Sequence, residues 1–231
     1  MRAVLLFAAS VLVAGCSQAP SGEQRATQLT PISPSRPAAA APTSSQTPTS
    51  TRTGAGAAPP PGSPIAAVIA WTEAATPLEL DEFHIALRGG ATTALGDDVA
   101  FTTASGTTCM TDTRRGSAAL ACLVDLRDPP PQPAEVYGVW KGGWVDFDGA
   151  GVQIGSAHGD PGRFAAGQGP PLPPGNSLAF GDFRCRTDTE VLVCVNYARR
   201  TAVRYSDSGI DTYGCTRQAR PAAGIGVQYS C

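Results

Sequence analysis

Short apolar and β-branched runs, separated by Gly, Pro and Asp, recur through this 231-residue chain from residue 65 onward. This pattern is typical of an all-β domain. The predicted strands are Ala66–Thr72, Glu82–Leu87, Val99–Thr103, Thr107–Thr111, Ala119–Leu126, Trp144–Phe147, Val152–Ile154, Ser177–Phe180, Phe183–Arg186, Val191–Tyr197, Ala202–Ser206 and Val227–Tyr229. Short helical turns are expected at Glu73–Leu80 and Ser206–Ile210. Since so many short strands must stack or close to protect their edges, we expect a twisted sandwich or a partly open barrel.

The one long apolar run, Ala3–Val13, follows Arg2 and leads into Val13-Ala14-Gly15-Cys16. This arrangement is that of a cleaved signal peptide. It resembles the lipobox of bacterial lipoproteins, which implies cleavage after Gly15, diacylglycerol on the Cys16 sulfur and further acylation, such as palmitate, on the new amino terminus. Two or three acyl chains anchor a protein stably, here at the extracytoplasmic face of the cell membrane. The alternative is an ordinary signal peptide followed by an incidental cysteine.

Residues 17–63 contain nine prolines and no Phe, Trp, Tyr or Cys. Such a segment cannot bury enough apolar surface to offset its chain entropy, so we expect a disordered linker with a reach of about 40 to 145 Å. The predicted organisation is a signal peptide (1–15), a lipidated cysteine with its linker (16–63) and one extracytoplasmic domain (64–231).

Six cysteines follow Cys16, and export to an oxidising compartment favours three disulfides. Two segments share the pattern Cys-x-Thr-Asp-Thr, a variable tip and Leu-x-Cys, and each has an odd cysteine separation that places its two cysteines opposite each other in a hairpin. The turns would close on Arg115-Gly116 and on Thr189-Glu190, where a four-residue loop is the better turn. The predicted pairs are Cys109 with Cys122, Cys185 with Cys194 and Cys215 with Cys231.

The shared pattern has two explanations, duplication of one hairpin unit and chance similarity. Zinc and thiol-redox sites both need closely spaced cysteines or nearby histidines, which this sequence lacks, so we expect no metal and no cofactor.

Two long loops, Pro129–Pro133 and residues 155–176, are rich in proline. We interpret them as covers for sheet edges; a functional loop is the alternative.

The charges of the domain differ between its halves. Residues 64–162 carry five basic and thirteen acidic side chains, and residues 163–231 carry eight and five. This difference fits either a polar ligand at the boundary or solvated faces without function. The net negative domain with scattered arginines argues against nucleic-acid binding.

Only His84 and His158 are available as general bases. His84 alternates with apolar neighbours, which favours a half-buried strand position. Ser156, His158 and Asp160 share one loop, whereas catalytic triads are held by separate rigid elements. Asp146-Phe147-Asp148-Gly149 begins like a calcium loop but lacks its later oxygen ligands, so a hairpin turn is the better interpretation. We therefore predict no catalytic residues.

Tyr137, Trp140 and Trp144 flank the Lys141-Gly142-Gly143 segment. These aromatic side chains would either stack on a sugar ring or pack into the core, and core packing is the expectation for a small β domain.

Three stretches, Leu95–Thr103, Gly143–Gly149 and Phe180–Arg186, together with Val193–Ala198, resemble the mycobacterial LppI-type lipoproteins. That resemblance implies an anchored envelope protein and carries no catalytic residues. The segment Cys185–Tyr205 is also similar to a disulfide hairpin of actinobacterial secreted proteins. The sequence therefore predicts a non-enzymatic binding or structural module, anchored to the membrane, with an envelope glycan, lipid or protein as partner. The alternative is a carrier or hydrolase acting on envelope lipid or glycan through Trp140, Trp144, Asp146, Asp148 and Asp160.

Overall fold

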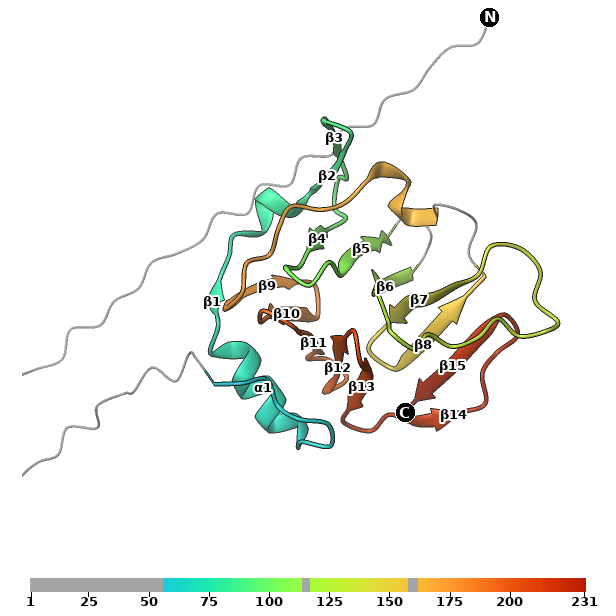
Figure 1. The fold of residues 1–231 in the computed structure, drawn as a ribbon. Helices are drawn as coiled ribbons and strands as arrows, with labels where there is room; N and C mark the ends of the chain where they lie inside the picture. The colour runs from blue at the N-terminus through green and yellow to red at the C-terminus, as the bar shows by residue number, and fades with distance from the viewer. Residues whose placement is uncertain (1–55, 114–116, 158–161) are drawn as a thin grey trace, which may run out of the picture. The chain divides into compact units, whose positions relative to one another are not determined.

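The computed structural model describes residues 56–113, 117–157 and 162–231 (Figure 1). The helical elements are α1 (Ile65–Glu73), η1 (Leu80–Phe83) and η3 (Gly162–Ala166). The strands are β1 (Thr76–Pro77), β2 (Ile85–Arg88), β3 (Ala91–Ala94), β4 (Ala100–Thr102), β5 (Thr108–Asp112), β6 (Ser117–Leu123), β7 (Lys141–Phe147), β8 (Gly151–Ser156), β9 (Asn176–Phe180), β10 (Phe183–Thr187), β11 (Leu192–Asn196), β12 (Thr201–Ser206), β13 (Gly209–Tyr213), β14 (Arg217–Ala219) and β15 (Ile225–Ser230).

Two sheets make up most of the described residues. One has the order β1-β9-β10-β11-β12-β13 and the other β14-β15-β8-β7-β6-β5-β4, while β2 and β3 form a separate hairpin. Side chains from both large sheets share one core, so the sheets form a sandwich. The prediction of an all-β, disulfide-linked domain is confirmed, and the sheets of the described residues do not close into a barrel.

Each sheet contains a meander of five antiparallel strands, β4 to β8 in one and β9 to β13 in the other. The first cysteine of each predicted hairpin lies on the second strand and pairs directly with the second cysteine on the third strand. The third and fourth strands continue this match, pairing Cys122 with Val145 and Leu120 with Phe147 in one meander, and Cys194 with Val203 and Leu192 with Tyr205 in the other. The repeat in the sequence therefore marks a structural repeat larger than one hairpin.

All three predicted disulfides are formed. Cys109, Cys122, Cys185 and Cys194 are fully buried between the sheets. The tip of the second hairpin is the four-residue loop after Thr187, closed by the Asp188 amide donating to the Val191 carbonyl at 2.8 Å. The predicted Arg115-Gly116 tip lies outside the described residues.

The strand predicted at Ala66–Thr72 is wrong, because this segment forms helix α1. Pro64 precedes the helix, and Val68 and Thr72, one helical turn apart, are its buried residues. Val68 packs on β11 and β12 of the six-stranded sheet. The β-branched residues of α1 favour a strand locally, and this sheet face overrides that preference.

Other predicted elements also differ. The Glu82–Leu87 segment divides into η1 and β2, and Glu73–Leu80 contains the end of α1 and β1 rather than a helical turn. The expected turn of helix at Ser206–Ile210 is the β12–β13 hairpin, in which Ser206 pairs with Gly209. Strand β13 is a short edge strand that pairs only with β12 among the described strands. Its own sequence is too short to predict a strand, and the pairing with β12 determines its conformation.

The two proline-rich loops lie on different parts of the seven-stranded sheet. Pro170 and Leu172 exchange backbone hydrogen bonds with Thr102 on edge strand β4, at 2.9 and 2.8 Å, so this loop covers an edge as predicted. Pro129 and Pro130 instead approach Gly142 on β7 and Gly226 on β15. Since both strands lie inside the sheet, the Pro129–Pro133 loop covers a face rather than an edge.

Contacts with the sandwich begin before the predicted boundary at residue 64. The Trp71 indole donates to the Gly56 carbonyl at 2.8 Å, and the Tyr213 hydroxyl donates to the Pro59 carbonyl at 2.9 Å. Residues 56–63 therefore pack with the domain.

Candidate functional site

Three residues considered at the sequence level, Cys16, His158 and Asp160, lie outside the described residues. His84 is half-buried, as predicted, but it follows η1 instead of lying within a strand. Its Nδ1 lies 2.9 Å from the Asp98 backbone carbonyl, to which it donates. This bond gives His84 a structural role at the start of β2.

Asp148 closes the turn between β7 and β8. Its Oδ1 accepts hydrogen bonds from the Ala150 and Gly151 amides at 2.8 and 2.7 Å, which is the hairpin-turn interpretation of this motif. Within residues 56–113, 117–157 and 162–231, no group of three or more His, Cys, Asp and Glu side chains is placed to hold a metal ion.

The aromatic side chains of this region have three different environments. Trp144 is 1% exposed and packs edge-on against Phe164 of η3, with ring centroids 5.2 Å apart, so core packing is correct for it. Trp140 is half-buried over the sheet face, and its Nε1 donates to the Pro130 carbonyl at 2.9 Å. Tyr137 is 90% exposed.

A row of three polar side chains crosses the outer face of the seven-stranded sheet. Asp146 on β7 pairs with Gln153 on β8, and Gln153 pairs with Gln228 on β15. Their sequence neighbours on each strand point into the core between the sheets, so the three polar residues share the opposite face. We call Asp146, Gln153 and Gln228 the polar row.

Arg163 reaches the polar row from η3. One guanidinium nitrogen lies 3.5 Å from Asp146 Oδ1, and another donates to the Ala119 carbonyl at 3.0 Å. The Trp144 indole donates to Asp146 Oδ2 at 2.8 Å. The Arg163 and Asp146 side chains are only 13% and 19% exposed, so their ion pair is more shielded from water than a surface pair.

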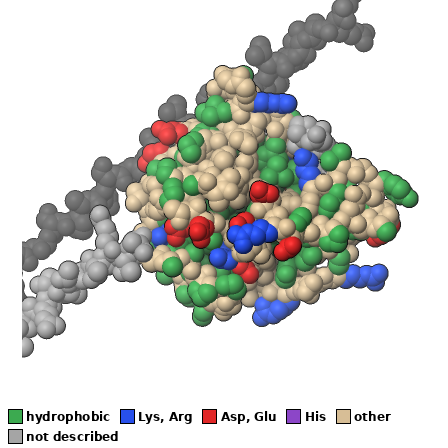
Figure 2. Space-filling view, in the orientation of Figure 1, with side chains coloured by type: hydrophobic (Ala, Val, Ile, Leu, Met, Phe, Trp, Pro, Cys, Tyr) green, Lys and Arg blue, Asp and Glu red, His purple; other side chains and the backbone are tan. Residues whose placement is uncertain are grey.

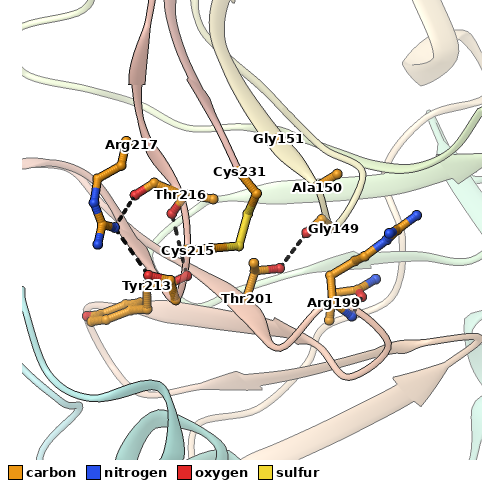
Figure 3. Close-up of a disulfide and its surroundings, with 12 residues drawn as sticks. Gly149, Ala150, Gly151, Arg199, Thr201, Tyr213, Cys215, Thr216, Arg217 and Cys231 are labelled. Atoms are coloured by element: carbon orange, nitrogen blue, oxygen red, sulfur yellow. Dashed lines mark hydrogen bonds between the residues drawn. A yellow bond between two sulfur atoms is a disulfide. The ribbon is translucent and has the colours of Figure 1, made fainter.

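An open pocket of about 450 Å³ surrounds these groups, which we call the Asp146 pocket. The polar row and Arg163 form one part of its wall, and the rest consists of Ala119, Asp148, Ala150, Gly151, Tyr229, Ser230 and Cys231. The Cys215–Cys231 disulfide fixes one end of that wall, and Figure 3 shows it beside Ala150 and Gly151. In addition, the Cys231 amide donates to the Ala150 carbonyl at 3.1 Å.

The β7–β8 turn at this pocket is held by the other sheet. The Thr201 hydroxyl at the start of β12 donates to the Gly149 carbonyl at 2.6 Å (Figure 3). Gly149 has φ +89° and approaches Asn196 so closely that a Cβ would lie 2.6 Å from its side chain. The turn is therefore positioned by the sandwich rather than by its own residues alone.

The two glutamines differ in their hydrogen bonding. Gln228 Oε1 accepts from the Ala222 amide at 2.9 Å, which leaves its Nε2 hydrogens for another acceptor. Gln153 is half-buried and makes no side-chain hydrogen bond within the described part of the chain. Both amides thus retain hydrogen-bonding capacity at the pocket.

Charges on the visible face do not separate into an acidic and a basic half. Figure 2 shows side chains of both signs gathered near its middle. Within the Asp146 pocket, Arg163 offsets Asp146, and Asp148 adds a second carboxylate. This balance suits a neutral ligand better than an anionic one.

Sequence reasoning identified Asp146 but missed Arg163, Gln153 and Gln228. A local signal was present for the glutamines, since Val145-Asp146-Phe147, Val152-Gln153-Ile154 and Val227-Gln228-Tyr229 each place one polar residue between two apolar ones. Comparison with protein-family models, with characterised proteins and with solved structures gives no match.

Proposed function

We propose that this protein is a lipid-anchored module of the cell envelope that binds a small polar ligand in the Asp146 pocket without transforming it. The observation that carries the proposal is the side chain of Gln153, which lies in the middle of the polar row at the pocket wall and makes no side-chain hydrogen bond to another described residue. The amide atoms of Gln153 are not enclosed by the protein, so a ligand can replace the water at both with well-placed hydrogen-bonding groups.

Two resemblances support the anchored location: that of Val13-Ala14-Gly15-Cys16 to a lipobox, and that of several stretches of the domain to LppI-type lipoproteins. None of the helices in the part of the chain that the structure describes has the length and apolar character that a bilayer crossing requires. The three disulfides fit an oxidising compartment outside the cytoplasm.

Hydrolysis and lipid transport are supported less well by the same contacts. Asp146 is held by Trp144 and Arg163, and Asp148 by the turn amides, so a carboxyl group that delivers a proton would have to leave these partners. A lipid carrier needs an enclosed apolar cavity. The Asp146 pocket is instead an open site lined by charged and amide groups.

Saturation-transfer NMR on the full chain, with a panel of monosaccharides, polyols, amino acids and fatty acids, tests the binding function. We expect a polar ligand whose affinity falls at least tenfold in Gln153→Leu. Gln218→Leu is the matched control, because Gln218 is exposed on β14 and does not line the pocket. Absence of binding by the unmodified chain, or equal losses in both variants, overturns the proposal. Substrate turnover that Asp146→Asn abolishes in a folded protein would establish a hydrolase instead.

The anchor is tested separately with Cys16→Ala. We expect this change to abolish metabolic labelling by a fatty-acid analogue, because the Cys16 thiol is the acyl acceptor. Labelling that persists in the variant contradicts the lipoprotein assignment without affecting the pocket.

A further inference from the structure

The polar row has a regular spacing that restricts the shape of its ligand. Asp146, Gln153 and Gln228 lie on neighbouring strands in direct register. Neighbouring strands are about 4.8 Å apart, so the row places one planar polar group at each such interval along a line perpendicular to the strands. An extended β-linked glycan advances by a similar distance for each sugar ring.

The chemical groups of the row suit sugar hydroxyls. The amides of Gln153 and Gln228 can each donate and accept, so each can bind vicinal hydroxyl groups in pairs. At Asp146 the carboxylate oxygens face Trp144 and Arg163, so the Arg163 guanidinium is the donor available to a hydroxyl at that end of the row. Arg163 offsets the charge of Asp146, and Asp148 leaves these three groups with one net negative charge, which disfavours an anionic ligand. A neutral polyhydroxyl chain matches these groups better than a peptide, whose backbone would pair with a sheet edge.

An indole borders the row. By register, Gly155 on β8 faces Gly226 on β15, two residues along from Gln153 and Gln228 and on the same sheet face. The Trp140 ring lies over both glycines, 2.7 Å from the position of a Cβ at Gly155 and 3.2 Å from that at Gly226. Two residues of a strand span about 7 Å, so the indole lies one side-chain row from the amides.

Trp140 is also held in place. The Pro130 carbonyl accepts the hydrogen bond from Trp140 Nε1. The Pro130 side chain also lies over Gly226, with its Cβ 2.8 Å from where a Cβ of Gly226 would be. The half-buried Trp140 ring is therefore presented at a fixed site, and aromatic rings fixed in this way pack well against the apolar faces of sugars. The glycines at 155 and 226 are required because any side chain there would displace the indole.

From these observations we infer that the ligand is a neutral, unbranched glycan that crosses β7, β8 and β15 along the polar row and contacts Trp140. This inference rests on the proposed binding function and adds the ligand class and its direction. At least three consecutive sugar units contact the protein, one at Gln228, one at Gln153 and one beside the Asp146–Arg163 ion pair.

The test is a length series of β-1,4-linked N-acetylglucosamine oligomers, from one to five units, titrated into the full chain by isothermal calorimetry. We expect affinity to rise at least tenfold from one unit to three and then to level off. Gln228→Leu should remove the gain from the third unit, and Trp140→Ala should weaken every oligomer. Tyr137→Ala is the matched aromatic control, since this exposed side chain lies on the same loop, and its affinities should not change.

The outcomes separate the two proposals. If circular dichroism shows that Trp140→Ala does not fold, the Gln228→Leu variant alone tests the glycan inference. Gln228 lies on β15, away from the β6–β7 loop that carries Trp140. Binding of the monosaccharide as tightly as the trimer overturns the inference and leaves the pocket function intact. Binding of a non-sugar ligand at Gln153, with no oligomer bound, does the same. No ligand of any class at the pocket overturns both.

Discussion

Individual buried arginines attach the outer layers to the sheets. Arg186 is 3% exposed, lies 3.8 Å above the Trp71 ring and donates to the Trp71 carbonyl, so it joins β10 to α1. Arg163 joins η3 to β6 and β7 through Ala119 and Asp146. Burial lowers the pKa of Arg186, opposed by the nearby Asp188, but the guanidinium remains charged at neutral pH. Each guanidinium thus adds a polar contact between a helical segment and a sheet, beside the apolar packing of that segment.

Replacing Arg186 with methionine tests this attachment. The variant keeps much of the side-chain volume but loses the cation–π contact and the hydrogen bond, so we expect about 2–3 kcal/mol lower stability in urea unfolding. Arg199→Met is the control, because Arg199 is exposed at the β11–β12 turn and should change stability by less than about 0.5 kcal/mol. Similar values for both variants would show that the contact with Trp71 contributes nothing.

The burial of Tyr205 is expected to lower the stability of the folded protein at alkaline pH. Its side chain is completely buried, its hydroxyl has no hydrogen-bond partner among the described residues, and burial, with a smaller effect of Asp146, strongly raises its pKa. In the unfolded chain Tyr205 ionises near pH 10, whereas in the folded protein it stays protonated. The unfolded state therefore binds fewer protons above about pH 10, and stability falls there by up to about 1.4 kcal/mol per pH unit for this group.

Tyr205→Phe should reduce that alkaline loss and leave stability near pH 7 unchanged or slightly higher, because it removes an unpartnered buried hydroxyl. Chemical denaturation between pH 7 and 11 measures both effects. Burial also raises the pKa of Tyr213, so Tyr213→Phe is a useful comparison. An unchanged alkaline slope in Tyr205→Phe would contradict the assignment.

Secondary-structure elements in this protein are stabilised by cross-strand partners more than by their own sequence. One disulfide links the second and third strands of each meander in the core, where Cys109, Cys122, Cys185 and Cys194 are 0% exposed. The third disulfide links the segment between β13 and β14 to the end of β15, and both of its cysteines are exposed. The disulfides therefore differ in accessibility, not only in position.

Thiol exchange requires access to a sulfur atom, so the Cys215–Cys231 bond should be reduced first. We expect low concentrations of dithiothreitol, followed by alkylation and mass spectrometry, to label Cys215 and Cys231 while the other four remain protected. The buried pairs should be labelled only where the domain unfolds. Equal labelling of all six cysteines under native conditions would show that the sandwich opens readily.

At the scale of the whole molecule, the folded part starts earlier than composition indicates. Gly56 and Pro59 accept hydrogen bonds from Trp71 and Tyr213, so this stretch of the proline-rich segment covers aromatic side chains near α1. Trp71 and Tyr213 also belong to the apolar layer between α1 and the six-stranded sheet. The segment therefore connects to the layer that holds the helix.

Two truncations test this boundary. A chain that begins at Gly56 should unfold at the same temperature as a longer one, whereas a chain that begins at Pro64 should lose about 1–2 kcal/mol with its two hydrogen bonds. Thermal unfolding of both truncated chains under identical conditions measures the difference. Equal melting temperatures would place the boundary at residue 64, as composition predicts.

The sequence by itself determined the β class, most strand positions, the disulfide pairing and the motif at Asp146. These features are local: strand alternation and odd cysteine spacing within a hairpin depend on residues close together in the chain. The resemblance to a lipobox is local in the same way, and its chemistry stays a prediction.

Only the tertiary structure decided α1 and the polar row. The segment at Ala66–Thr72 contains β-branched residues that suit either a strand or a helix, and the sheet face beneath Val68 selected the helix. Gln153 and Gln228 are 75 positions apart and meet because β15 returns beside β8, while Arg163 arrives on a different element. Strand order and register depend on long-range pairing across many residues, and no local pattern encodes which strands become neighbours.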